Sequence, residues 1–89
     1  MAKRRERLEI IKDILNSIQN NRNIRYTRLL HISNLSPQMF NDYVNELIEK
    51  KLIKECKDSK FRYFILTDKG SKFIKEYQIL LNVIRNFGL

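Results

Sequence analysis

The chain contains few of the residues that form cross-links, metal sites and sharp turns. Its 89 residues include one cysteine, one histidine, one proline, two glycines and no tryptophan. Because Cys56 is alone, an intramolecular disulfide is excluded, and with His31 as the single histidine so is a Cys/His zinc site. We interpret Cys56 as a half-buried strand residue and His31 as a helix-surface or packing residue. The sequence thus predicts no metal and no cofactor.

Long apolar runs and catalytic patterns are missing as well. No stretch approaches the roughly 20 apolar residues of a membrane span, and the charged N-terminus is unlike a signal peptide. The sequence has no nucleophile paired with a base, no evident carboxylate pair and no glycine-rich phosphate loop. We therefore expect a cytoplasmic protein without a membrane or small-molecule partner, and an enzyme is the weakest functional hypothesis.

Positive charge, in contrast, is in excess. Lysine and arginine number 18 against 10 acidic residues, which gives a net charge of +8, and a hydrophobic content of 43% is typical of one folded, soluble domain. This charge favours nucleic acid as partner, with an anionic membrane surface second and a merely basic protein as the plainer alternative. Most basic residues gather at the N-terminus (Lys3, Arg4, Arg5, Arg7), around the first connection (Arg22, Arg25, Arg28) and farther along (Lys54, Lys57, Lys60, Arg62).

The first half of the chain predicts two helices. Apolar residues at helical spacing indicate a helix over residues 5–20, ended by asparagines, which tolerate left-handed backbone. Residues 24–26 fit a very short strand. A second helix is expected over residues 28–33, with Thr27 as its N-cap or a first-turn residue. The next two residues form a turn.

The clearest start signal belongs to a third helix over residues 36–50. Ser36 can cap this helix, and Pro37 suits its first position, where the missing N–H costs nothing. One face is apolar, with Phe40, Val44, Leu47 and Ile48, and the other is polar, with Gln38, Asn41, Asp42, Asn45 and Glu49. We expect the polar face to be exposed.

The second half predicts a β-hairpin and a long helix. Strand-forming stretches over residues 53–58 and 61–66 flank a polar turn at Ser59 and Lys60. A helix then begins at Thr67 and Asp68 and carries a heptad seam. The seam consists of Phe73, Tyr77, Leu80, Ile84 and Phe87, with Leu81 among the apolar flanking residues. A helix of about 20 residues is about 30 Å long, so we favour a dimer interface over a helix that folds back as core.

This order of elements indicates a mainly α fold with a small β-hairpin, the winged helix-turn-helix. We expect a DNA-binding part over residues 1–66 and a C-terminal dimerisation helix over residues 67–89, within one compact unit. The major groove of duplex DNA admits one α-helix, so the third helix can lie in it while the second braces it. The hairpin would then reach adjacent phosphates or the minor groove.

Three segments carry a further resemblance: KRRERLEIIKDIL, TRLLHISNLSPQMFNDYVNELIEKKLI and FILTDKGSKFIKEY, which together span most of residues 3–77. They resemble the small archaeal winged helix-turn-helix proteins that dimerise through a C-terminal antiparallel coiled coil, and LTDKG is the most family-like short signature. The resemblance implies duplex-DNA binding as a homodimer, in gene regulation or chromosome organisation. Where that family usually has glycine before the hairpin, this chain has Lys51, which in left-handed backbone would cost about 1–2 kcal/mol. A slightly different end of the third helix is the alternative.

The third helix supplies the candidates for base reading. Gln38, Asn41 and Asn45 share its polar face, and such side chains can pair two-pronged with adenine, although ordinary solvated residues are the alternative. Because this helix has no Lys or Arg before Lys50, phosphate contacts must come from elsewhere. We assign them to Arg4, Arg5, Arg7, Arg28, Ser36, Lys57, Lys60 and Arg62, and the dimer interface to Phe73, Tyr77, Leu80, Leu81, Ile84 and Phe87.

Three functions remain in competition. We favour a sequence-preferring regulator that binds double-stranded DNA as a homodimer and is associated with the nucleoid. A non-specific chromatin-organising protein is the first alternative, because phosphate contacts give affinity without sequence information. A winged helix that contacts only proteins is the second, but its third helix should then have an apolar or acidic outer face.

Overall fold

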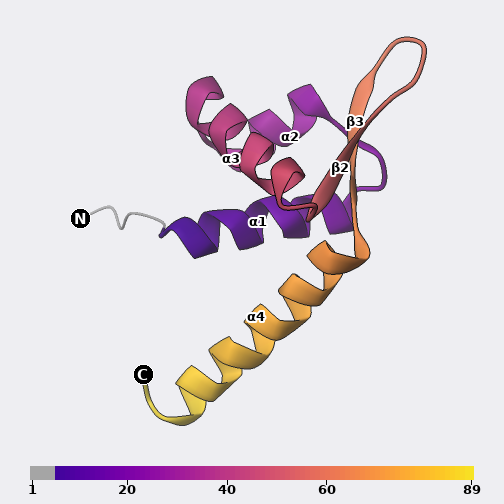
Figure 1. Cartoon of the computed structure of the whole chain (residues 1–89). Helices are drawn as coiled ribbons and strands as arrows, with labels where there is room; N and C mark the ends of the chain where they lie inside the picture. The colour runs from indigo at the N-terminus through magenta and orange to yellow at the C-terminus, as the bar shows by residue number, and fades with distance from the viewer. Residues whose placement is uncertain (1–5) are drawn as a thin grey trace.

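The computed structural model describes residues 6–89, which fold into four helices and three short strands (Figure 1). In chain order these are α1 (Arg7–Asn20), β1 (Ile24–Arg25), α2 (Tyr26–Ser33), α3 (Pro37–Glu49), β2 (Ile53–Lys57), β3 (Arg62–Leu66) and α4 (Asp68–Asn86). The predicted fold class, mainly α with a β-hairpin between the third and last helices, is confirmed. None of these helices is both long and apolar enough to traverse a lipid bilayer.

The start of α2 differs from the prediction. The helix begins at Tyr26, two residues earlier than expected, so the assignment of Tyr26 to a strand is wrong, and Thr27 is a first-turn residue rather than the N-cap. Arg25 occupies the N-cap position with extended backbone. The Tyr26 ring packs against Phe40 and Phe64, at centroid distances of 5.3 and 6.3 Å. These contacts with distant parts of the chain favour a start that the local sequence does not reveal.

Other boundaries shift by one or two residues for local reasons. Helix α1 begins at Arg7 rather than at residue 5, because Glu6 keeps extended backbone. The strands of the hairpin are each one residue shorter than predicted. Asp58 leaves the strand because its carboxylate accepts hydrogen bonds from the backbone N–H groups of Lys60 and Phe61, at 2.9 and 2.8 Å, which closes the turn.

The three strands form one antiparallel sheet in the order β1–β3–β2. Ile24 lies opposite Phe64, and Ile53 opposite Leu66, which places apolar side chains of the sheet toward the helices. The core consists of Ile10, Ile11, Ile14, Leu15, Ile18, Ile24, Leu29, Phe40, Val44, Leu47, Leu52, Ile53 and Phe64. Every element except α4 contributes to this set. The apolar stripe of α3 is therefore fixed inward, which leaves its other face toward solvent.

Lys51 occupies the left-handed backbone that the family would give to glycine. Among residues 6–89, three non-glycine residues have positive φ: Asn23 (54°), Asn34 (57°) and Lys51 (64°). The two asparagines tolerate this conformation, whereas a lysine is strained there. The conformation lets the N–H of Leu52 donate to the carbonyl of Leu47 at 2.9 Å, which satisfies the end of α3 and turns the chain into β2.

Replacing Lys51 with glycine is expected to stabilise the protein. Relief of the left-handed strain exceeds the added entropy of the unfolded chain, so the free energy of unfolding should rise by about 1 kcal/mol. Urea denaturation would measure the change. Lys54→Gly, in the extended backbone of β2, is the control and should lower stability. A Lys51→Gly variant that is no more stable than the wild type would contradict the strain at this position.

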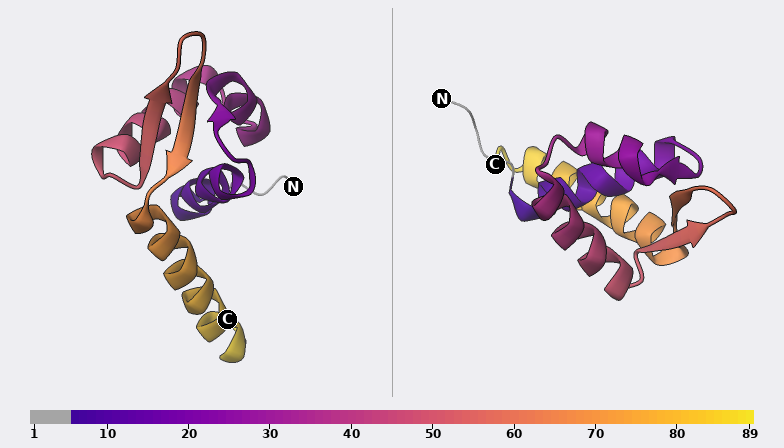
Figure 2. Two further views of the ribbon diagram at one scale, coloured as in Figure 1. Left: turned by 90° about the vertical axis from the view of Figure 1, so that its right-hand side faces the viewer. Right: turned by 90° about the horizontal axis from the view of Figure 1, so that it is seen from above.

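The LTDKG signature joins the hairpin to α4. Thr67 caps the helix, with its hydroxyl oxygen 3.0 Å from the N–H of Gly70, and the same hydroxyl lies 2.9 Å from the carbonyl oxygen of Leu52. A Cβ atom on Gly70 would lie 2.2 Å from that carbonyl oxygen. Only glycine therefore lets the first turn of α4 approach the strand so closely. From there α4 leaves the body at the end opposite the hairpin tip (Figure 2).

Candidate nucleic-acid interface

The outward face of α3 carries the predicted base-reading residues. Gln38, Asn41 and Asn45 are all exposed, while Phe40 and Val44 on the other face are buried. Asp42 and Glu49 share the outward face and are exposed as well. The structure thus brings the three amide side chains together on one solvent-facing surface that also includes two carboxylates.

Ser36 begins this helix as predicted. Its side-chain oxygen accepts a hydrogen bond from the N–H of Met39 at 3.3 Å, and Pro37 follows in the first helical turn. The hydroxyl group is exposed and keeps its own proton for donation. Ser36 can therefore cap the helix and still meet an anion outside it.

Arg7, which was expected to contact phosphate, forms an ion pair with Glu46 of α3. Its guanidinium binds Glu46 with both terminal nitrogens, with Nη1 2.8 Å from Oε1, and Lys50 adds a contact of 2.8 Å to Oε2 of the same carboxylate. The hydrogen bonds from Arg7 and then Lys50 lower the pKa of Glu46 to about 2, and Glu46 raises the pKa of Arg7. Arg7 thus fastens α1 to α3. Arg4 and Arg5 lie outside the described residues.

The low pKa of Glu46 predicts acid sensitivity. A carboxylate whose pKa falls from its ordinary value of 4.5 to about 2 on folding stabilises the fold above pH 4.5, and this contribution is lost as the pH falls through 2. Glu46→Gln should therefore be less stable than the wild type at pH 6, and the difference should shrink toward zero near pH 2. Urea unfolding at several pH values measures it. Glu49→Gln is the control; a pH-independent difference for Glu46→Gln would contradict the ion pair.

The tip of the hairpin is basic and tightly turned. Lys57 at the end of β2 and Lys60 in the turn are both exposed. Hydrogen bonds from the backbone N–H groups of Lys60 and Phe61, followed by the charge of Arg25, lower the pKa of Asp58. The ionised carboxylate of Asp58 thus holds the turn closed. The two lysines are therefore displayed on an ordered loop, where they can face an anionic surface.

Arg62, also assigned to phosphate contact, has protein partners. Its Nε lies 3.0 Å from Oε2 of Glu55 on the paired strand, and its guanidinium carbon lies 4.7 Å from the ring centroid of Tyr26. Its charge is thus shared with a carboxylate. Its main role in the structure is to join the hairpin to the start of α2.

Arg25 is a residue that the sequence interpretation missed. Its guanidinium lies 3.7 Å above the ring of Phe61, so β1 contributes a third cation to the hairpin tip beside Lys57 and Lys60. A two-residue strand is too short to show alternation. The only feature of the sequence that pointed to Arg25 was its membership of the group of basic residues around the first connection.

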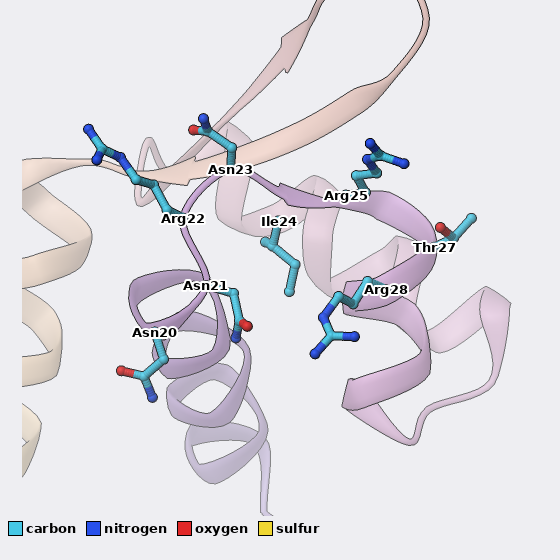
Figure 3. A pocket seen from close by; sticks show the side chains of 8 residues that line it. All are labelled: Asn20, Asn21, Arg22, Asn23, Ile24, Arg25, Thr27 and Arg28. Atoms are coloured by element: carbon cyan, nitrogen blue, oxygen red, sulfur yellow. The ribbon is translucent and has the colours of Figure 1, made fainter.

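Arg28, a predicted phosphate contact, borders a hollow between two helices. This hollow, of about 630 Å³, lies between the end of α1 and the start of α2 (Figure 3). In the close-up Arg28 and Asn21 are directed toward its interior, whereas Arg22 and Arg25 point away from it. The three arginines therefore do not converge on one anion. Within residues 6–89, no three His, Cys, Asp or Glu side chains gather closely enough to hold a metal ion.

Helix α4 carries a large exposed apolar surface. Ile79, Leu80, Val83 and Phe87 keep 61, 51, 46 and 78% of their surface exposed. Along the predicted seam, Phe73 packs on the core, Tyr77 and Ile84 are half-buried, and Leu80 and Phe87 are exposed. A hollow of about 200 Å³ lined by Leu8, Phe73, Glu76, Tyr77 and Leu80 separates this seam from α1. The predicted interface residues thus form an apolar surface continuous with the core.

Comparison with known proteins identifies the fold. A model of the winged helix-turn-helix family matches residues 4–85. The DNA-binding protein Sso10a-2 from Sulfolobus solfataricus is similar, with a TM-score of 0.78, 17% identity, and coverage of 93% of this chain and 85% of that one. SSV1 F-93 gives a TM-score of 0.69 at 21% identity, with 88 and 91% coverage.

A bacterial regulator has the same fold within a longer chain. The PcaV transcriptional regulator of Streptomyces coelicolor gives a TM-score of 0.78 at 14% identity over 88% of this chain, which spans only 60% of that protein. A search of curated proteins finds no match. The family match covers all four helices and the hairpin, and the predicted resemblance is confirmed at that level: the chain belongs to the winged helix-turn-helix family.

Proposed function

We propose that this protein binds double-stranded DNA as a homodimer and regulates transcription, with α3 in the major groove. The observation that carries this proposal is the exposed amide face of α3 beside a basic hairpin tip. Gln38, Asn41 and Asn45 would meet base edges. Lys57 and Lys60, with Arg25 and Arg28, would meet the phosphates on either side.

The location of positive charge favours this arrangement. α3 carries no Lys or Arg within Pro37–Glu49 and has two exposed carboxylates, Asp42 and Glu49, so it cannot bind DNA by charge alone. Affinity would come from the flanking cations and sequence preference from the amides. Two proteins of similar fold, the DNA-binding protein Sso10a-2 and the transcriptional regulator PcaV, support a role on DNA.

Dimerisation would complete the function. The exposed apolar residues of α4 offer a surface for a second copy, since covering a large aliphatic or aromatic side chain contributes about 1.5–3 kcal/mol. A twofold dimer would present two copies of α3 to a pseudo-palindromic site. Binding of two half-sites at once raises affinity without new contacts.

A mobility shift across a salt series tests the proposal. The probes are a duplex enriched from a random library by the protein and a shuffled duplex of the same composition. We expect the enriched duplex to bind at least about 100-fold more tightly at physiological salt. Equal binding would instead indicate a non-specific chromatin protein, and no binding to either would contradict a role on DNA.

A further inference from the structure

Tyr26 lies where α2, α3 and β3 contact one another. It is the first residue of α2, and its ring contacts Phe40 of α3 edge-on and Phe64 of β3 at a tilt. Arg62 of the hairpin covers the ring from another side, with its charge held by Glu55. Phe40 and Phe64 are both fully buried. The ring is therefore held between α3 and the hairpin, which fixes the position of its hydroxyl group.

The hydroxyl group reaches the outward face of α3. It donates a hydrogen bond to Oδ1 of Asn41, an exposed residue among the candidates for base reading. In the described part of the chain, neither Gln38 nor Asn45 has a hydrogen-bonded side-chain partner. Asn41 is thus the one member of this set whose amide plane is set in advance by a neighbouring element.

This hydrogen bond changes which groups of the Asn41 side chain can form hydrogen bonds with a base. Two-pronged pairing with adenine needs Oδ1 to accept from the adenine amino group while Nδ2 donates to N7. The hydrogen bond from Tyr26 occupies one of the two lone pairs of Oδ1 and fixes the amide plane, and Nδ2, which only donates, is the part of the amide without a protein partner among the described residues. Pairing with adenine would need the second lone pair of Oδ1 within this fixed plane. The acceptors available in the major groove are N7 and O6 of guanine, N7 of adenine and O4 of thymine.

We propose that Tyr26 is a specificity-determining positioning residue, which turns Asn41 into a hydrogen-bond donor toward acceptor edges of the major groove. The inference rests on the proposed function and deepens it, because it assigns the base chemistry that one position of the recognition helix accepts. Through Arg62 the same tyrosine also ties the placement of the hairpin to the orientation of Asn41.

Tyr26→Phe is the principal test, read out by enrichment of bound duplexes from a random library. The variant keeps the packed ring and removes only the hydroxyl, so the fold is retained. Freed from its partner, Asn41 can pair two-pronged with adenine, and the preference for A over the wild-type base should rise about 3- to 10-fold at a single base pair. In an Asn41→Ala background, Tyr26→Phe should change no preference.

Asn41→Asp tests the donor assignment independently. Aspartate keeps an acceptor for the Tyr26 hydroxyl but replaces the outward Nδ2 donor with a second acceptor. The preference at the same base pair should move toward the amino groups of cytosine or adenine. Tyr43→Phe is the matched control, because it removes a hydroxyl from α3 two positions away, on the other side of the helix.

Each outcome separates the two proposals. A shift confined to one base pair, absent in the Asn41→Ala background, supports the positioning role. Unchanged base preferences in Tyr26→Phe, or a shift that persists without Asn41, overturns it while leaving DNA binding intact. Wild-type binding without any base preference also overturns it. Failure of the wild type to bind any duplex in the same assay overturns the proposed function itself.

Discussion

Leu80→Asp combined with Ile84→Asp is expected to yield a monomer that binds a two-half-site duplex at least about 100-fold more weakly than the wild type. Both residues lie on the seam of α4, and Leu80 is 51% exposed in the single chain. A carboxylate there would have to be desolvated in an interface, which costs several kcal/mol for each unpaired charge. The same carboxylates cost less in a monomer, where position 80 is exposed and position 84 is half-buried.

Sedimentation velocity and a mobility shift measure the two effects. The wild type should sediment as twice 10.8 kDa and the double variant as 10.8 kDa. Gln78→Asp with Asn82→Asp is the matched control, because it places the same two charges four residues apart on the polar side of α4. Circular dichroism checks that the variants remain folded. A double variant that is still dimeric would rule out this seam as the interface.

Lys57→Gln combined with Lys60→Gln is expected to weaken binding to every duplex by about tenfold or more at low salt. Each phosphate contact contributes a slope of about 0.9 to the plot of log affinity against log salt. A dimer that loses two contacts from each protomer should therefore have a slope lower by about 3.6. Because these contacts carry no sequence information, the enriched and shuffled duplexes should lose affinity alike.

Fluorescence anisotropy at several salt concentrations provides both the affinity and the slope. Lys72→Gln with Lys75→Gln is the control, since it removes the same charge from exposed positions of α4, away from the hairpin tip. Its slope should stay close to that of the wild type. If the hairpin and control variants lose affinity equally, net charge rather than a phosphate contact at the hairpin governs binding.

Elements whose stability is set locally could be predicted from the sequence. Ser36 and Pro37 marked the start of α3, and Thr67 with Asp68 marked that of α4, because caps and first-turn residues act within a few positions. The apolar periodicity of α3 fixed which face would be buried, and the exposed amides followed. The glycine position expected from the family left two possibilities at Lys51, left-handed backbone or a different end of α3, and the structure has left-handed backbone there.

The contacts that organise the site could not be predicted in this way. Arg7 and Glu46 are 39 residues apart, so their ion pair depends on how α1 crosses α3. Tyr26 begins α2 where local propensity favoured a strand, and its ring is held by side chains from α3 and β3. Such contacts follow from tertiary packing, and a single sequence contains no repeating pattern that would reveal them.

The most direct test of the central claim is an NMR titration of the ¹⁵N-labelled protein with its enriched duplex. If α3 enters the groove, the side-chain amide signals of Gln38, Asn41 and Asn45 should shift or broaden together with the backbone signals of residues 57–62. The side-chain amides of Gln19 on α1 and Gln78 on α4 are internal controls and should change little. Changes confined to α1 or α4, with α3 unaffected, would contradict recognition through this helix.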